Sequence, residues 1–318
     1  IEDVSYSRPR GIGFDVSRLY TSEAAWLKAG CYSSLGIALN FYDFHNPSIL
    51  GKSLTASFYA EPVWYYSSRF SVHSRAGIGI AYLSKVYDRQ NNPENKFFST
   101  KISFKVLLSL SMKYRITNHL EFELGGFYNH ISNGGMKMPN KGMNFPTVSA
   151  GVNYCFSPVK LKDRSYLKTR YKINEEWSKY LLFSTSVKNI NARDSFPEKL
   201  CHIYGIGFGI NYPTSFRSSL HCGIEYTYDG YEKEKIVRNE LKGNHHRVAV
   251  LFGNEFLFGR FSFTQKLGVS VYAPKEQKPI YQRYGLWYKI NGHLIVGSTL
   301  KARLQVADIF DFRIGIRF

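Results

Sequence analysis

His130 and Ser132 are two positions apart in the segment FYNHISNGGMKMPNKGMNF, which covers residues 127–145. A serine hydroxyl is too weakly acidic to attack an ester unaided, whereas a histidine within about 3 Å can remove its proton. Alternate residues of a β-strand share one face, so a strand would bring the two side chains together. The glycines after Ser132 would let backbone N–H groups turn toward an oxyanion. The spacing is compatible with nucleophilic ester cleavage, although His-x-Ser alone is a weak motif.

The chain carries alternating apolar segments that are longer than the strands of most soluble proteins. The segment KISFKVLLSLSMKYRI, residues 101–116, places apolar side chains on one face and, apart from Leu107, small or cationic residues on the other. Soluble strands are about 5–6 residues long, whereas strands of about 9–11 residues with one apolar face suit a closed barrel in lipid. Similar alternation recurs around residues 70–82, 148–156 and 204–212. The pattern predicts an all-β, transmembrane antiparallel β-barrel with its apolar face outward.

Short and long connections alternate along the chain, as they do in outer-membrane barrels, whose periplasmic turns are short and whose outer loops are long. Asn291-Gly292 is a strong hairpin signal, and YDRQNNPENK is typical of a long polar loop. We count seven clear strands before Ser157 and eight after it, and we expect one more within Glu23–Ser33 to make the number even. The sequence thus predicts one barrel of about 14–16 strands.

The two halves of the chain resemble each other. TNHLEFELGGFYNHIS in the first half corresponds to NGHLIVGSTLKARLQV in the second, which indicates an internal duplication. In this alignment His130 and Ser132 fall on Leu304 and Val306, so the second half lacks the pair. We therefore predict three parts: a first half of the barrel at 1–156, a basic connecting segment at 157–180, and a second half of the same barrel, a degenerate repeat without the site motif, at 181–318.

The chain ends in IFDFRIGIRF, where apolar and aromatic residues alternate up to Phe318. This ending resembles the closing-strand signal of outer-membrane proteins, so we expect the outer-membrane assembly machinery to be a partner. No run approaches the roughly 18 apolar residues of a membrane-spanning helix, and the first residues lack a signal pattern. We expect a protein of the bacterial outer membrane whose signal peptide has already been removed.

The predicted barrel turns the histidine and serine toward lipid. Even-numbered residues from Phe122 to Ser132 share the apolar face, and this strand runs outward when counted back from the C-terminus. His130 and Ser132 would lie level with the outer leaflet, where polar side chains cost free energy. They could be ordinary polar residues of the interface, so the loop that follows decides between the two interpretations. Glu121 and Glu123 lie on the opposite face, where we expect them to pair with Lys or Arg.

The loop continues a longer pattern: His-x-Ser-Asn, a small residue, Gly, and then Pro-Asn-x-Gly. These positions are held by His130, Ser132, Asn133, Gly134, Gly135, Pro139, Asn140 and Gly142. At these residues the first half of the chain, to about Phe156, resembles the PagL family of outer-membrane lipid A 3-O-deacylases. The second half departs from the family's smaller barrel. The resemblance implies a serine esterase on the barrel exterior that removes an ester-linked 3-hydroxyacyl chain from lipid A.

Carried over residue by residue, the resemblance implies that Ser132 is the nucleophile and His130 its general base. Asn133 and the backbone N–H of Gly135 would stabilise the oxyanion. The family's third catalytic residue is a glutamate, whereas the matching position here holds Asn144. An amide can orient the imidazole but only weakly stabilises the imidazolium, so we expect slow catalysis or none.

The formal net charge of +18 is spread over loops and polar strand faces. This spread argues against a nucleic-acid module and favours an anionic lipid, so we expect lipid A or lipopolysaccharide as the partner. Lys137 and Lys141, in the motif loop, are candidate contacts to its headgroup. The four cysteines show no metal-ligand spacing, and we expect neither a metal ion nor a cofactor. Two alternatives remain: an inactive barrel that is a scaffold or partner of a membrane complex, and a channel.

Overall fold

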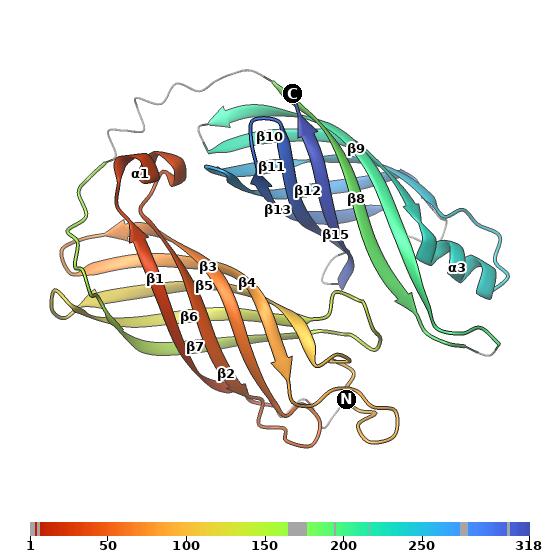
Figure 1. Ribbon diagram of the computed structural model, residues 1–318, viewed down its shortest axis with the longest axis horizontal. Helices are drawn as coiled ribbons and strands as arrows, with labels where there is room; N and C mark the ends of the chain where they lie inside the picture. Colours follow the sequence, from red (N-terminus) through yellow and green to blue (C-terminus); the bar gives the residue numbers. More distant parts are fainter. Residues whose placement is uncertain are drawn as a thin grey trace. The chain divides into compact units, whose positions relative to one another are not determined.

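A computed structural model describes residue 4 and residues 7–164, 177–193, 195–215, 217–273, 279–303 and 306–318. Most of these residues lie in antiparallel β-strands (Figure 1), and the predicted all-β class is confirmed. The chain divides into two compact units, each with its own sheet. Within the described ranges, no helix is long and apolar enough to cross a membrane.

The first unit is a sheet of seven strands in sequence order, each antiparallel to the next, with the first and last strands at its edges. Its elements are β1 (Arg10–Tyr20), α1 (Glu23–Ala29), β2 (Ser33–Asp43), β3 (Lys52–Tyr66), β4 (Phe70–Leu83), β5 (Ile102–Arg115), β6 (Leu120–Ser132) and β7 (Met143–Tyr154). The seven strands expected before Ser157 are confirmed.

The additional strand expected within Glu23–Ser33 is wrong, because α1 occupies most of that segment. The Ser22 side chain accepts a hydrogen bond from the Ala25 N–H and so caps the start of the helix. Gly30 ends it in the left-handed conformation, with φ at 60°. Because the segment between these two capping residues is helical, it does not show the alternation of a strand.

The second unit is a closed barrel of eight antiparallel strands. Its elements are β8 (Ser178–Ile190), β9 (Lys199–Ser215), β10 (Ser218–Asp229), α3 (Gly230–Arg238), β11 (His246–Phe258), β12 (Phe261–Tyr272), β13 (Ile280–Lys289), β14 (Leu294–Arg303) and β15 (Val306–Arg317). The eight strands expected after Ser157 are confirmed.

The prediction that both halves build one barrel wall is wrong. The last strand, β15, pairs with β8, for example Phe312 with Thr185, and so closes the second unit on itself. Phe312–Arg317 pair with Tyr180–Thr185, and β14 and β9 lie on the other sides of these two strands, so β8 to β15 form a closed ring that includes no strand of the first unit. Alternation in the sequence reports which face is apolar, but it does not report which strands meet. Half of the connecting segment predicted at 157–180, residues 165–176, and Leu304 in the alignment of the halves, lie outside the described residues.

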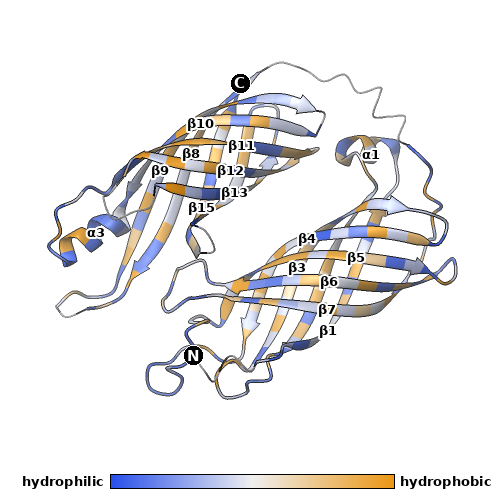
Figure 2. Cartoon of the chain, turned by 180° about the vertical axis from the view of Figure 1, so that it is seen from behind, coloured by the Kyte–Doolittle hydropathy of each residue, from blue (hydrophilic) through white to orange (hydrophobic). Residues whose placement is uncertain are grey.

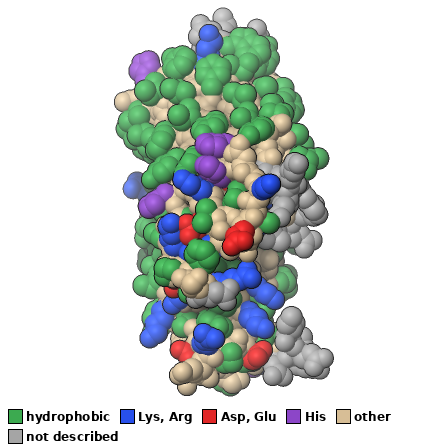
Figure 3. Space-filling model, turned by 90° about the vertical axis from the view of Figure 1, so that its right-hand side faces the viewer, with side chains coloured by type: hydrophobic (Ala, Val, Ile, Leu, Met, Phe, Trp, Pro, Cys, Tyr) green, Lys and Arg blue, Asp and Glu red, His purple; other side chains and the backbone are tan. Residues whose placement is uncertain are grey.

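The strands carry apolar side chains on the outside and polar ones on the inside, as expected. Figure 2 shows hydrophobic and hydrophilic residues interspersed along the strands. On β5, Leu108 and Leu110 are 49% and 61% exposed, whereas Ser103, Lys105 and Ser111 are buried. The face in Figure 3 accordingly shows wide hydrophobic areas, with Lys and Arg side chains gathered elsewhere on it. A solvent-facing sheet would need the reverse pattern, so the exterior suits lipid.

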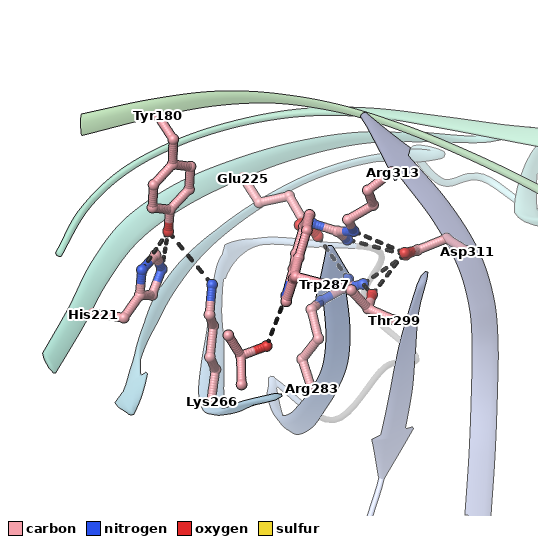
Figure 4. A network of polar contacts seen from close by, with 10 residues as sticks. Tyr180, His221, Glu225, Lys266, Arg283, Trp287, Thr299, Asp311 and Arg313 are labelled. Carbon is pink, nitrogen blue, oxygen red and sulfur yellow. Dashed lines mark hydrogen bonds and ion pairs between the residues drawn. The ribbon is translucent and has the colours of Figure 1, made fainter. Parts of the chain in front are cut away.

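The interior of the closed barrel is filled by a network of charged side chains (Figure 4). Arg283 donates to Glu225 and to Asp311, both at 2.6 Å, and Arg313 donates to the same two carboxylates at 2.6 and 2.7 Å. The space left among the residues around Glu225 measures about 10 Å³, which is at most about one water molecule. This packing disfavours the channel alternative for the second unit.

The first unit also pairs its interior charges. Glu61 lies 2.6 Å from Arg75 and 2.5 Å from Lys113, and all three side chains are nearly buried. Lys113 is also 3.7 Å from Glu123, and Arg115 is 3.3 Å from Glu121. The expectation that both glutamates pair with cations on the inner face is confirmed, so neither belongs to the site around His130.

The loop between β4 and β5 offers a test of orientation. The polar sequence of this loop predicts an accessible Asn95, but this residue is fully buried and donates to the Ile49 carbonyl at 2.8 Å. Asn91 is exposed in the same loop, and Asn118 is exposed in the short turn at the opposite end of the strands. In a chain whose four native cysteines are replaced by serine, we expect Asn91→Cys to react with an impermeant thiol reagent on whole cells and Asn118→Cys to be protected. The reverse labelling would invert the predicted topology.

Candidate active site

At the outer end of the β6–β7 hairpin, buried apolar side chains and more exposed polar ones lie on opposite faces of the strands. Ile131, Met143 and Phe145 are buried in a hydrophobic cluster that also contains Phe44, Leu50, Leu83 and Phe98. The intervening residues, His130 and Ser132, are partly exposed, and Asn144 is exposed. The buried cluster therefore fixes the strand ends, while these three polar side chains lie on the opposite, outward face.

His130 and Asn144 are directly opposite each other in the β6–β7 register. His130 Nδ1 lies 2.5 Å from Asn144 Oδ1. Because an amide oxygen only accepts, Nδ1 is the donor in this contact, and in the neutral imidazole Nε2 then keeps its lone pair. The imidazole is thus held in the tautomer that a general base requires. The sequence predicted this pair, and the register explains how residues 14 positions apart come together.

Gly142 shows that the histidine and serine side chains converge. A Cβ built on Gly142 would lie 3.0 Å from His130 Cε1 and 3.0 Å from Ser132 Cβ. His130 Cε1 and Ser132 Cβ are therefore separated by no more than twice 3.0 Å. Gly142 also has φ of +64°, a conformation that favours glycine. The motif's last glycine is needed because any side chain there would press against both residues.

The loop between β6 and β7 is held in place by a distant segment. Asn133 is fully buried, and its Nδ2 donates to Ser99 Oγ at 2.8 Å. The Lys141 N–H donates to the Lys96 carbonyl at 3.0 Å. Ser99 and Lys96 were not predicted as part of the site, since nothing in the composition of residues 84–101 indicates which loop they contact.

The expected oxyanion residues occupy the first turn of this loop. The Asn133 N–H donates to Asn140 Oδ1 at 3.2 Å, so both nitrogens of Asn133 already donate within the protein. Gly134 and Gly135 follow with φ of 68° and 83°, which turns successive peptide groups away from the strand direction. Lys137 and Lys141, the expected headgroup contacts, are both exposed. This geometry favours Asn133 as a residue that positions the loop.

Two family models match the chain. Residues 12–153 match the lipid A 3-O-deacylase (PagL) model, and residues 176–318 match the model described as the acyloxyacyl hydrolase, C-terminal domain. The chain belongs to the PagL family. Membership identifies it as an outer-membrane lipid A deacylase, a hydrolase of ester bonds whose substrate is lipid A. The expectation that the second half departs from the family is wrong, because that half matches a PagL model of its own.

No match was found among curated protein sequences. Solved structures similar to this PagL family member include a Rh. blastica porin mutant, at 6% identity and TM-score 0.19, covering 98% of this chain and 91% of that one. Another is the alcaligin outer-membrane receptor FauA from Bordetella pertussis, at 10% identity and TM-score 0.24, covering 97% of this chain and 60% of that one. TM-scores this low carry no argument about site or mechanism, so these rest on the family and on the geometry.

The close approach at Gly142 yields a test of the PagL site. We expect Gly142→Ala to lower lipid A deacylation by about tenfold or more, because misplacing reacting groups by about 1 Å can cost a hundredfold. Gly259→Ala is the matched control, since Gly259 also has positive φ, at 67°, but lies in a turn of the second unit. The measurement is the deacylation rate of purified, heat-modifiable protein. Equal rates for the two variants would show that Gly142 does not shape the site.

Proposed function

We propose that the chain is a serine esterase that removes an ester-linked 3-hydroxyacyl chain from lipid A at the outer leaflet. The observation that carries this proposal is the hydrogen bond from His130 Nδ1 to Asn144 Oδ1, beside Ser132, on the outward face of the sheet. A membrane-embedded ester can reach such a site sideways, without leaving the lipid. PagL membership supports the substrate and the reaction class.

The proposed reaction has two steps. Ser132 Oγ attacks the ester carbonyl while His130 Nε2 takes the hydroxyl proton, and the negative charge on the carbonyl oxygen is stabilised by the Gly135 N–H. The intermediate expels the sugar oxygen, which receives the proton from His130, and leaves an acyl group on Ser132. His130 then removes a proton from water, which attacks the acyl-enzyme carbonyl. The intermediate expels Ser132 Oγ, which receives that proton from His130, and the 3-hydroxy fatty acid is released. Asn133 acts in this scheme by holding the loop that carries Gly135.

The substrate's sugar phosphates would lie beside the outer loops. Lys137 and Lys141 are exposed on the loop that follows Ser132 and provide cations for these phosphates. Attraction between loop cations and anionic headgroups would keep the ester level with the catalytic side chains. We further propose that the outer-membrane assembly machinery binds the β15 strand up to Phe318, whose alternating apolar residues support this assignment.

Removal of the nucleophile tests the proposed mechanism. We expect Ser132→Ala to abolish release of the 3-hydroxyacyl chain, measured by mass spectrometry of lipid A from cells with and without the protein. Barrel folding should be unchanged, because the Ser132 side chain is partly exposed on the outward face. Heat-modifiable migration in electrophoresis provides the folding control. Full activity in the variant would remove Ser132 from the mechanism.

Substitutions of Asn144 distinguish a slow enzyme from an inactive scaffold. A carboxylate at this position would stabilise the imidazolium, so we expect Asn144→Glu to raise the deacylation rate by about tenfold, or about 1.4 kcal/mol of barrier. Asn144→Ala should lower the rate, because Nδ1 would lose its orienting acceptor. The comparison uses initial rates on lipid A in mixed micelles. Rates equal to the parent in both variants would exclude Asn144 as the orienting residue, and inactivity of both parent and Glu variant would favour the scaffold.

A further inference from the structure

A buried hydrogen-bond network lies on the inner face of the first unit, behind the candidate active site. Lys105 Nζ donates to Tyr42 OH at 3.2 Å, and Tyr42 OH donates to Asn129 Oδ1 at 3.2 Å. Asn129 Nδ2 in turn donates to the Phe145 carbonyl at 3.4 Å and to Thr147 Oγ1 at 3.3 Å. The network therefore connects β5 and β2 to both strands of the β6–β7 hairpin.

The network ends at the strand pair next to the one that carries the candidate general base. Asn129 is directly opposite Phe145 in the β6–β7 register, and His130 is directly opposite Asn144. Alternate residues point to opposite faces, so the first pair faces inward and the second faces outward. The contact from the Asn129 side chain to the Phe145 carbonyl joins the two strands from the inside. The relative position of His130 and Asn144 therefore depends on how firmly the adjacent pair is held.

Tyr42 holds this inward-facing pair in two ways. Its ring packs edge-on against the Phe145 ring, with the centroids 5.2 Å apart, and its hydroxyl donates to Asn129. Tyr42 and Asn129 are both buried, and the exposed fraction of Asn129 is zero, so bulk water does not reach the Asn129 amide. A buried polar group that loses its hydrogen bond costs about 1–3 kcal/mol. The network therefore disfavours other arrangements of the two strands at this point.

Lys105 is a buried cation that donates to hydroxyl groups. It is 1% exposed, and its Nζ donates to Thr55 Oγ1 at 3.0 Å as well as to Tyr42 OH. By contrast, Lys113 of the same strand lies 2.5 Å from the Glu61 carboxylate. Donation from an ammonium polarises the tyrosine hydroxyl, which strengthens the hydrogen bond that this hydroxyl donates in turn. Lys105 thus reinforces the contact through which Tyr42 holds the hairpin.

We propose that Asn129, Tyr42 and Lys105 are positioning residues for the esterase reaction. From the inner face of the sheet they hold His130 opposite Asn144, so that the imidazole keeps the tautomer that a general base needs. The proposal rests on the proposed function and adds residues that do not touch the substrate. Loss of the network would let the ends of β6 and β7 shift against each other and misalign the two outward side chains. Proton transfer would then slow, whereas binding of lipid A on the outward face would not change.

Tyr42→Phe tests the proposal, because it removes the hydroxyl and keeps the ring that packs on Phe145. We expect kcat for lipid A deacylation to fall about tenfold, with KM within about twofold of the parent, since misplacing reacting groups by about 1 Å can cost a hundredfold. In an Asn144→Ala background His130 has already lost its acceptor, so the same change should alter kcat by less than about twofold. An equal loss in both backgrounds, or no loss in the parent, would overturn the proposal.

Tyr59→Phe is the matched control. Tyr59 is 3% exposed on the inner face of the same unit, and its hydroxyl donates to Asp15 at 2.6 Å. This contact joins β3 to β1 and does not involve the β6–β7 hairpin. We expect the variant to keep kcat within about twofold of the parent. A loss as large as that in Tyr42→Phe would show that the effect is common to interior hydroxyls, and the assignment of the network would be wrong.

The tautomer of His130 provides a readout that does not depend on ester release. In protein labelled with ¹⁵N-histidine, nuclear magnetic resonance at about pH 9, where histidine is ordinarily neutral, shows which ring nitrogen carries the proton. We expect the Nδ1–H tautomer in the parent and in Tyr59→Phe, and a mixture of tautomers in Tyr42→Phe, with the His130 signal identified by its loss in His130→Gln. The same tautomer in the parent and in Tyr42→Phe would contradict the positioning role. Failure of the proposed function would appear instead as no ester release by the parent, with the change of tautomer still present.

Discussion

The constraint on which this structure depends is that lipid offers no hydrogen bonds to a polypeptide backbone. In the closed barrel each strand pairs with a neighbour on both sides, and its apolar face turns toward lipid while its polar side chains turn inward. Inside the closed barrel these side chains need partners, because an unpaired buried charge is costly. Glu225 and Asp311 provide them for Arg283 and Arg313. The side chains that fill the interior thus follow from the alternation that makes the exterior apolar.

The same alternation places the candidate active site outside. Because Ile131, Met143 and Phe145 must face the buried cluster, His130, Ser132 and Asn144 have to face outward. The relative positions of these three side chains then depend only on nearby backbone geometry, which is set by the antiparallel register and the positive φ of Gly142. A soluble esterase encloses its substrate in a cleft, whereas in the proposed function the membrane would present the ester to a rigid wall.

The sequence predicted the strands well because alternation is a local property. It predicted the pairing of Glu121 and Glu123 with cations for the same reason, since face and charge can both be counted. It did not predict that β15 closes on β8, because closure depends on which distant strands meet. A seven-stranded sheet beside a closed eight-stranded barrel has the same alternation as one large barrel. Ser99 and Lys96, which hold the motif loop, are also distant contacts.

Two free energies bear on why an amide, and not a carboxylate, faces His130: the cost of a charge on the lipid face and the height of the catalytic barrier. A carboxylate at Asn144 would lie at the outer end of β7, where charged side chains on the lipid face cost about 0–1 kcal/mol, and acidic ones less than basic ones. A tenfold loss of rate corresponds to about 1.4 kcal/mol of barrier. The stability gained by avoiding the charge is therefore smaller than the barrier penalty that a neutral partner imposes. Insertion into the membrane does not account for Asn144, so the reason for the amide has to be sought in the rate or the role of the site itself.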